Sequence, residues 1–151
     1  MDTRTTRARG RGAGRTTLQG AALAVGIVFL LVGIAGFIPG ITTSYGDLSF
    51  AGHHSDAKLL GLFQVSILHN IVHLLFGVVG LALSRTADGA RTFLIGGGVV
   101  YLVLWLLGIV GGGDWIPVYR ADNWLHFVLG GGMIALGFVT GRERSRRIVP
   151  A

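Results

Sequence analysis

The sequence predicts an all-α membrane protein, a bundle of four transmembrane helices that forms one domain. Of its 151 residues, 51% are apolar and only 13% are charged, whereas soluble proteins contain about 25% charged residues. Four apolar blocks without Asp, Glu, Lys or Arg approach the roughly 20 residues that a helix needs to cross a bilayer. Strands of a transmembrane barrel alternate between apolar and polar residues, and these long runs do not, so they exclude a barrel. The blocks are Leu18–Ile38, Ser66–Leu83, Thr92–Gly112 and Asn123–Thr140.

The basic residues predict how this bundle is oriented. All but two of them lie before the first block, between the second and third, or after the fourth, and the two exceptions are Lys58 and Arg120. Because cytoplasmic segments carry the excess of Lys and Arg, we expect a multi-pass protein of the cell membrane with both termini in the cytoplasm. The formal charge of +6 then indicates attraction to anionic lipid, and we expect no nucleic-acid partner. The residues on the cytoplasmic side are Arg4, Arg7, Arg9, Arg11, Arg15, Arg85, Arg91, Arg142, Arg144, Arg146 and Arg147.

Residues 1–17 precede the first helix and contain almost nothing apolar. A segment of this composition cannot bury enough surface to fold, so we expect a disordered basic cytoplasmic tail. The first block is longer than the about 7–15 apolar residues of a signal peptide, and no small-residue cleavage site with a polar flank follows it. The sequence therefore favours a retained helix, which Pro39 and Gly40 bring to an end.

The second helix has two candidate starting points. Residues 59–65 are apolar enough to extend it outward as a tilted span from Leu59. We prefer a start at Ser66, because Ser is a favoured N-cap residue. Residues 59–65 then lie along the outer interface of the membrane.

The segment between the third and fourth helices is expected to lie outside the membrane. Aromatic residues in and beside it fit the belt that such residues form at membrane interfaces: Trp115, Tyr119 and Trp124. Asp122 is placed to cap the fourth helix. The transmembrane domain then covers residues 18–140, and residues 141–151 form a second basic cytoplasmic tail.

One polar signature occurs twice in the chain. Asn70-Ile71-Val72-His73 is followed by Gly77, and Asn123-Trp124-Leu125-His126 is followed at the same spacing by Gly130. The repetition predicts that the first two helices correspond to the last two. Because each half contains two spans, this 2+2 arrangement is a parallel internal repeat about an axis along the membrane normal.

Small or polar residues form one stripe on each predicted helix, at alternating spacings of four and three. This periodicity keeps one face turned toward neighbouring helices that cross at about +20°. Small residues let helix backbones approach, since lipid supplies no hydrophobic drive toward association. The stripes are Ala22, Gly26, Phe29, Gly33, Gly36 and Gly40; Ser66, Asn70, His73, Gly77, Gly80 and Ser84; Gly97, Tyr101, Leu104, Gly108 and Gly111; and Asn123, His126, Gly130, Met133, Gly137 and Thr140.

A polar cluster is expected at the outer ends of the second and fourth helices. Ionisable residues in membrane segments mark functional sites or pair with one another. The residues can serve interhelical hydrogen bonding, hold haem or a metal between His73 and His126, or handle protons or a small solute. The members are His69, Asn70, His73, Asp122, Asn123 and His126.

A metal site is one reading of this cluster. His69 and His73 have the i, i+4 spacing of helical metal ligands, but Asn70 stands where a HExxH motif has its glutamate. Together with Asp122 and His126 they could surround one cation. A second metal-friendly group lies in the outer loop, where His53-His54-Ser55-Asp56 follows Asp47.

The residues do not favour an enzyme. The chain contains no cysteine, which excludes disulfides, thiol catalysis and thiolate metal sites. Phosphate loops, nucleophile elbows and acidic metal motifs are also missing, so general acids and bases are nearly confined to histidines. We therefore expect a noncatalytic structural or interaction module without a resident cofactor. Its partners are the lipid bilayer and a second copy of the chain or another membrane protein.

The segment Leu60–Gly77, with its His-Asn-x-x-His core, and the segment Asn123–His126 resemble a bacterial family of small four-helix membrane proteins that is catalogued as a domain of unknown function. The resemblance covers roughly residues 18–140. Family members often carry Asn at the position of Ser66, and both residues can cap a helix. The resemblance implies the fold and a membrane location, and it implies no activity.

Overall fold

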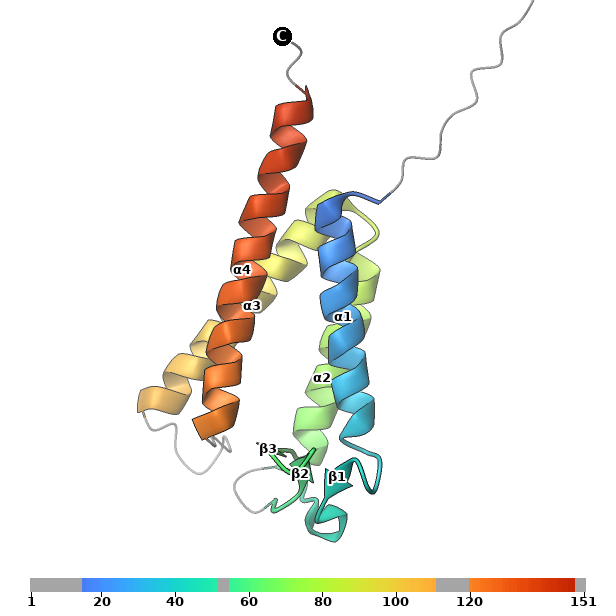
Figure 1. The fold of residues 1–151 in the computed structure, drawn as a ribbon, viewed down its shortest axis with the longest axis vertical. Coiled ribbons are helices and arrows are strands. Elements are labelled where there is room, and N and C mark those ends of the chain that lie inside the picture. The colour runs from blue at the N-terminus through green and yellow to red at the C-terminus, as the bar shows by residue number, and fades with distance from the viewer. Residues whose placement is uncertain (1–14, 52–54, 111–119, 149–151) are drawn as a thin grey trace, which may run out of the picture.

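The fold consists of four helices and a small sheet (Figure 1). The structure is a computed structural model, which describes residues 15–51, 55–110 and 120–148. The helices are α1 (Thr17–Ala35), α2 (Ile67–Leu83), α3 (Ala87–Val110) and α4 (Arg120–Ile148). By length and composition α1, α3 and the segment Asp122–Thr140 of α4 can cross a membrane, whereas α2 is a shorter apolar helix. At 1.5 Å per residue α2 reaches about 26 Å, slightly less than a hydrocarbon core of about 30 Å.

Local side-chain chemistry explains where α1 and α2 begin. Thr16 caps α1 in a capping box with Gln19, which satisfies two backbone donors at once. Ser66 caps α2, because its hydroxyl accepts a hydrogen bond from the backbone N–H of His69 at 3.1 Å. The expected start of the second helix at Ser66 is therefore confirmed, and an extension from Leu59 is not seen.

The other helix boundaries differ from the expected ones. α3 begins at Ala87, five residues before Thr92, because the Thr86 hydroxyl accepts the backbone N–H of Gly89 at 3.0 Å and caps the first turn. α1 ends at Ala35 rather than Ile38. α4 continues to Ile148, so residues 141–148 of the predicted C-terminal tail are helical.

The helices pair as two hairpins, α1 with α2 and α3 with α4. Glycines bring the backbones together in each of them. A Cβ added to Gly80 would lie 2.9 Å from the Cα of Gly26, and a Cβ added to Gly98 would lie 2.7 Å from the carbonyl oxygen of Gly130. Both contacts require glycine, as expected for close helix packing in a membrane.

The predicted stripes largely coincide with the buried faces. All six stripe residues of α2 are buried, and in α4 those from Gly130 to Thr140 are buried while Asn123 and His126 are half-buried. In α1 the stripe is buried from Ala22 to Gly36. In α3 the predicted stripe is right at Tyr101, which is buried, and wrong at Gly97, which is half-buried while Gly98 is buried; Leu104 and Gly108 are half-buried, and Gly111 lies outside the described residues.

A small three-stranded antiparallel sheet at one end of the bundle adds to the predicted helical fold, and the sequence analysis did not foresee it. It consists of β1 (Thr42–Thr43), β2 (Lys58–Leu59) and β3 (Phe63–Gln64), and the 3-10 helix η1 (Tyr45–Asp47) lies between the first two strands. The turn between β2 and β3 places Leu60 and Gly61 in the left-handed region, with φ of 52° and 71°. Leu59 and Val65 are buried beneath this hairpin. Residues 59–65 therefore form a hairpin at the helix ends, and their expected place along the membrane interface stays a prediction.

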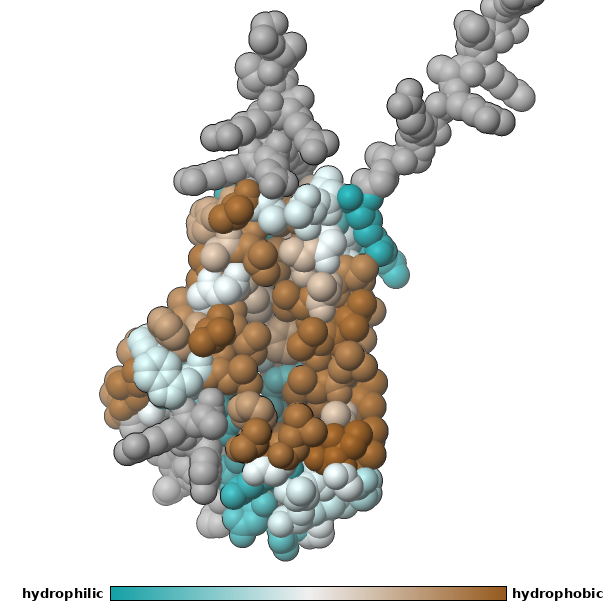
Figure 2. Space-filling model, in the orientation of Figure 1, coloured by the Kyte–Doolittle hydropathy of each residue, from teal (hydrophilic) through white to brown (hydrophobic). Residues whose placement is uncertain are grey.

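The two helical hairpins lie closer together near the α2–α3 turn than near the sheet, toward which they diverge (Figure 1). A core cluster joins them, with Ala22 and Phe29 of α1, Phe93 and Tyr101 of α3 and Met133 of α4 among its members. The outer faces of the helices are apolar over most of the surface that Figure 2 shows. Hydrophilic surface is visible in the hollow between the two hairpins and at the sheet end.

Candidate functional site

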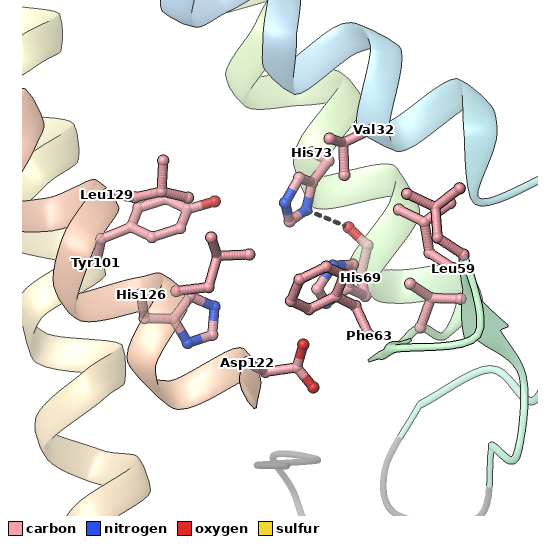
Figure 3. Close-up of a pocket in the computed structure, with 12 residues that line it drawn as sticks. Val32, Leu59, Phe63, His69, His73, Tyr101, Asp122, His126 and Leu129 are labelled. Atoms are coloured by element: carbon pink, nitrogen blue, oxygen red, sulfur yellow. Dashed lines mark hydrogen bonds between the residues drawn. The ribbon is translucent and has the colours of Figure 1, made fainter. Parts of the chain in front are cut away.

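A chamber of about 140 Å³, mainly apolar but with titratable side chains on both sides, lies between the two hairpins at the end of the bundle that carries the sheet (Figure 3). It is bounded by all four helices and by the β2–β3 hairpin. Four of its lining residues are titratable members of the predicted polar cluster. The lining residues are Val32, Leu59, Leu60, Phe63, Val65, His69, His73, Tyr101, Asp122, Leu125, His126 and Leu129.

The wall that α2 contributes consists of His69 and His73. Their rings stack with centroids 4.3 Å apart, because residues four apart lie one above the other on a helix. The Nδ1 of His73 lies 3.0 Å from the backbone carbonyl oxygen of His69. Since a carbonyl oxygen can only accept, Nδ1–H is the donor, and a neutral ring leaves Nε2 as an acceptor. Figure 3 shows the ring of His73 directed toward the helices of the other hairpin.

The opposite wall comes from α3 and α4. The rings of Tyr101 and His126 meet edge to face with centroids 5.3 Å apart. Among the described residues, Nδ1 of His126 is buried without a hydrogen-bond partner. Phe29 links the two walls, because its ring lies 5.5 Å from that of His73 and 5.3 Å from that of Tyr101.

Asp122 lies in the first turn of α4 and is only 4% exposed. The backbone of Gln64 in β3 donates a hydrogen bond to its carboxyl group. The second carboxyl oxygen, Oδ2, is buried and has no partner within the described part of the chain. The prediction that Asp122 caps α4 was wrong, because the helix begins two residues before it, at Arg120. The side chain of Asp122 points toward the chamber instead (Figure 3).

The two asparagines of the predicted cluster do not line the chamber. Asn70 is fully buried between α1 and α2 and packs against Gly36, where an added Cβ would collide with its amide group. Both polar atoms of this amide lack a hydrogen-bond partner in the described ranges. Asn123 is half-buried, and its Oδ1 is likewise unpartnered there. Four of the six predicted residues thus line the chamber, Asn70 lies between α1 and α2, and Asn123 lies outside the chamber lining.

Sequence reasoning missed the chamber residues that lie outside α2 and α4. Tyr101 was assigned to a packing stripe, although it is also the polar residue of α3 that faces His126. Leu59, Phe63 and Val65 were placed at the interface, yet they cover the chamber from the sheet end. The turn residue Gly61 between two apolar pairs was the available signal for a hairpin.

The titratable residues do not converge as one metal site. Within residues 15–51, 55–110 and 120–148, no group of three His, Cys, Asp or Glu side chains is arranged to hold a metal ion. The cation site expected from His69, His73, Asp122 and His126 is therefore not formed, because the α2 pair stacks upon itself. His53 and His54 of the second candidate metal group lie outside the described residues.

The fold and the chamber define a small helical protein of membrane type with a polar site between two helical hairpins. The chain belongs to the family described as Domain of unknown function (DUF4383), whose model matches residues 19–139. No curated protein and no solved structure matches the chain. The resemblance that Leu60–Gly77 indicated is confirmed at the level of this family.

Proposed function

We propose that this protein is a noncatalytic binding or interaction module of the cell membrane, and that the chamber between its hairpins is its functional centre. One observation carries the proposal. The unpartnered Oδ2 of Asp122 and Nδ1 of His126 belong to two residues that line the same cavity, and each buried polar group left without a partner costs about 1–3 kcal/mol. In a side chain that serves only packing, nothing offsets this free-energy cost. In a side chain that binds a ligand, the hydrogen bond to the ligand offsets it.

The composition of the chamber supports a noncatalytic role. Its described lining contains no serine, threonine or lysine, and the nucleophile types that remain are histidine, aspartate and tyrosine. The two histidines of α2 stack on each other, and His73 uses one ring nitrogen to bond its own helix. Such an arrangement holds a ligand or a proton more readily than it activates an attacking group.

The positions of the basic residues support the proposed orientation. The start of α1, the α2–α3 turn and the end of α4 lie at the same end of the bundle (Figure 1). Arg15, Arg85 and Arg91 belong to this end, and four further arginines follow Thr140 in the sequence. The positive-inside rule puts this end in the cytoplasm, and the chamber then faces the outside.

The apolar perimeter supports the lipid bilayer as the first partner. Val28, Leu31, Leu75 and Val139 are each about half exposed or more, and lipid chains would cover them. We also propose that a second copy of the chain or another membrane protein contacts this perimeter. Cross-linking in native membranes, followed by measurement of the mass of the product, would distinguish a second copy of the chain from another membrane protein.

A redox role with haem or a metal between His73 and His126 is the alternative. The volume of the chamber disfavours haem, because pockets for ligands of drug size measure about 300–1,000 Å³. Handling of a small solute or of protons needs less room. A chamber of this size can hold several waters, since one water needs only about 10–15 Å³ on this measure.

The direct test is an absorption spectrum and an elemental analysis of the full chain, purified in mild detergent from a haem-replete host. We expect a colourless, folded protein without stoichiometric metal. His73→Ala should remain folded and lose about 0.5–1.5 kcal/mol of stability, because it removes the hydrogen bond from Nδ1 to the His69 carbonyl oxygen within α2. Leu75→Ala, at a position that is 59% exposed on the same helix, is the matched control. A Soret band, or a metal that disappears in His73→Ala, would replace the proposal with the redox role.

A further inference from the structure

We propose that the chamber binds a small ammonium ion with at least three N–H donors, either ammonium itself or a monoalkylammonium such as methylammonium. This inference rests on the proposed function, in which the chamber is the functional centre. It names the class of ligand from the hydrogen-bonding capacity of the lining residues. The lining residues favour a ligand with three properties: a positive charge, N–H donors and a small size.

The chamber presents acceptors on both walls. On the α2 side, His73 donates through Nδ1 to His69 and leaves Nε2 as an acceptor. On the α4 side, the unpartnered Oδ2 of Asp122 is an acceptor when the carboxyl group is ionised. Two acceptors on opposite sides of one cavity call for a ligand that donates in more than one direction. An ammonium group donates through three or four N–H bonds.

Charge and ring geometry favour a cation over a neutral donor. Asp122 is a buried carboxyl group, and when it is ionised a hydrogen bond to it is about twice as strong as a neutral one. Tyr101 and Phe63 add aromatic rings to the lining, and aromatic faces attract ammonium groups. Among the described residues, the lining includes neither arginine nor lysine that would repel a cation.

The dimensions of the chamber restrict the ligand. A volume of about 140 Å³ admits a ligand up to about the size of benzene, which includes ammonium and small alkylammonium ions. Leu125, Leu129 and Val32 provide an apolar lining that would contact a short alkyl group. A divalent metal ion is disfavoured, because no three ligating side chains of the described residues are grouped for it.

The test is a thermal unfolding titration of the full chain in detergent, followed by tryptophan fluorescence. Ammonium chloride and methylammonium chloride are compared with potassium chloride and tetramethylammonium chloride at constant ionic strength. A ligand that binds only the folded state raises Tm in a saturable manner. We expect this rise with ammonium and methylammonium, and no comparable rise with potassium, which lacks N–H donors, or with tetramethylammonium, which lacks them and is larger.

Two variants locate the effect. Asp122→Asn keeps the shape of the side chain and removes its charge, and it should weaken the apparent affinity about tenfold or more, as expected for loss of a charge-assisted hydrogen bond. Asp47→Asn makes the same change on the exposed η1 helix and should leave the affinity unchanged. The wild-type selectivity among the four salts is decisive even where Asp122→Asn folds poorly.

Equal effects of all four salts, or an unchanged response in a folded Asp122→Asn protein, would overturn the inference. Stabilisation by micromolar Zn²⁺ in place of ammonium would also overturn it and make the chamber a metal site. If ammonium fails while the protein is colourless and metal-free, the assignment of the ligand is lost and the proposed function is retained. An absorption spectrum of bound haem would contradict both the ammonium ligand and the proposed function.

Discussion

Substitution of Gly98 by alanine tests the helix contact that holds the second hairpin together. A Cβ at position 98 would lie 2.7 Å from the carbonyl oxygen of Gly130 and 2.7 Å from Cγ1 of Ile134, whereas ordinary contact begins at 3.4 Å. Because the oxygen belongs to the backbone, α3 and α4 must separate locally to accept the methyl group. Overpacking of this kind costs about 1–3 kcal/mol.

Gly96→Ala is the matched control on the same helix, since a Cβ at that position meets nothing within 4 Å. Both substitutions gain about the same helix propensity, close to 1 kcal/mol, so their difference isolates the contact. Unfolding in a titration with sodium dodecyl sulfate can be followed through Trp105, whose ring lies 4.8 Å from that of Phe127 across the α3–α4 interface. We expect Gly98→Ala to be less stable than Gly96→Ala by about 1–3 kcal/mol. Equal stability of the two variants would refute the close packing of α3 on α4.

Two further substitutions probe the polar residues outside the chamber. Asn70→Leu replaces a fully buried amide that lacks hydrogen-bond partners among the described residues and should stabilise the protein by about 1–3 kcal/mol; a loss of stability in the same detergent titration would show that the amide is bonded after all. Ser66→Ala removes the cap of α2 and should cost about 0.5–2 kcal/mol, whereas Ser66→Asn should restore most of it. An alanine variant as stable as the parent would contradict the capping role.

The sequence predicted the buried faces best where small or polar residues interrupt apolar runs. The stripe of α2 from Ser66 to Ser84 is buried at every position, because polar and small residues have no favourable place in lipid. α3 has adjacent glycines at positions 96–98. Periodicity alone cannot show which of these neighbouring glycines is buried. In the structure Gly98 is the buried one, because it contacts Gly130.

The sheet and the division of the polar cluster depended on tertiary structure. Two-residue strands leave no periodic pattern in a sequence, and only the left-handed turn at Gly61 hinted at the β2–β3 hairpin. Asn70 and His73 are one turn apart and share the buried face of α2. Even so, Asn70 packs on α1 while His73 faces the chamber. The spacing indicated a common buried face, and it could not distinguish a partner helix from a cavity.

Cysteine labelling of intact cells tests the central claim most directly, namely a membrane-spanning bundle whose chamber end faces outward. The chain has no cysteine, so single-cysteine variants need no altered background. Leu62→Cys lies at the sheet end, at a position that is 63% exposed, and Thr17→Cys lies at an exposed position at the start of α1. With a membrane-impermeant thiol reagent we predict labelling of Leu62→Cys in intact cells and of Thr17→Cys only after permeabilisation. Labelling of Thr17→Cys in intact cells, or equal labelling of both variants before permeabilisation, would contradict the account.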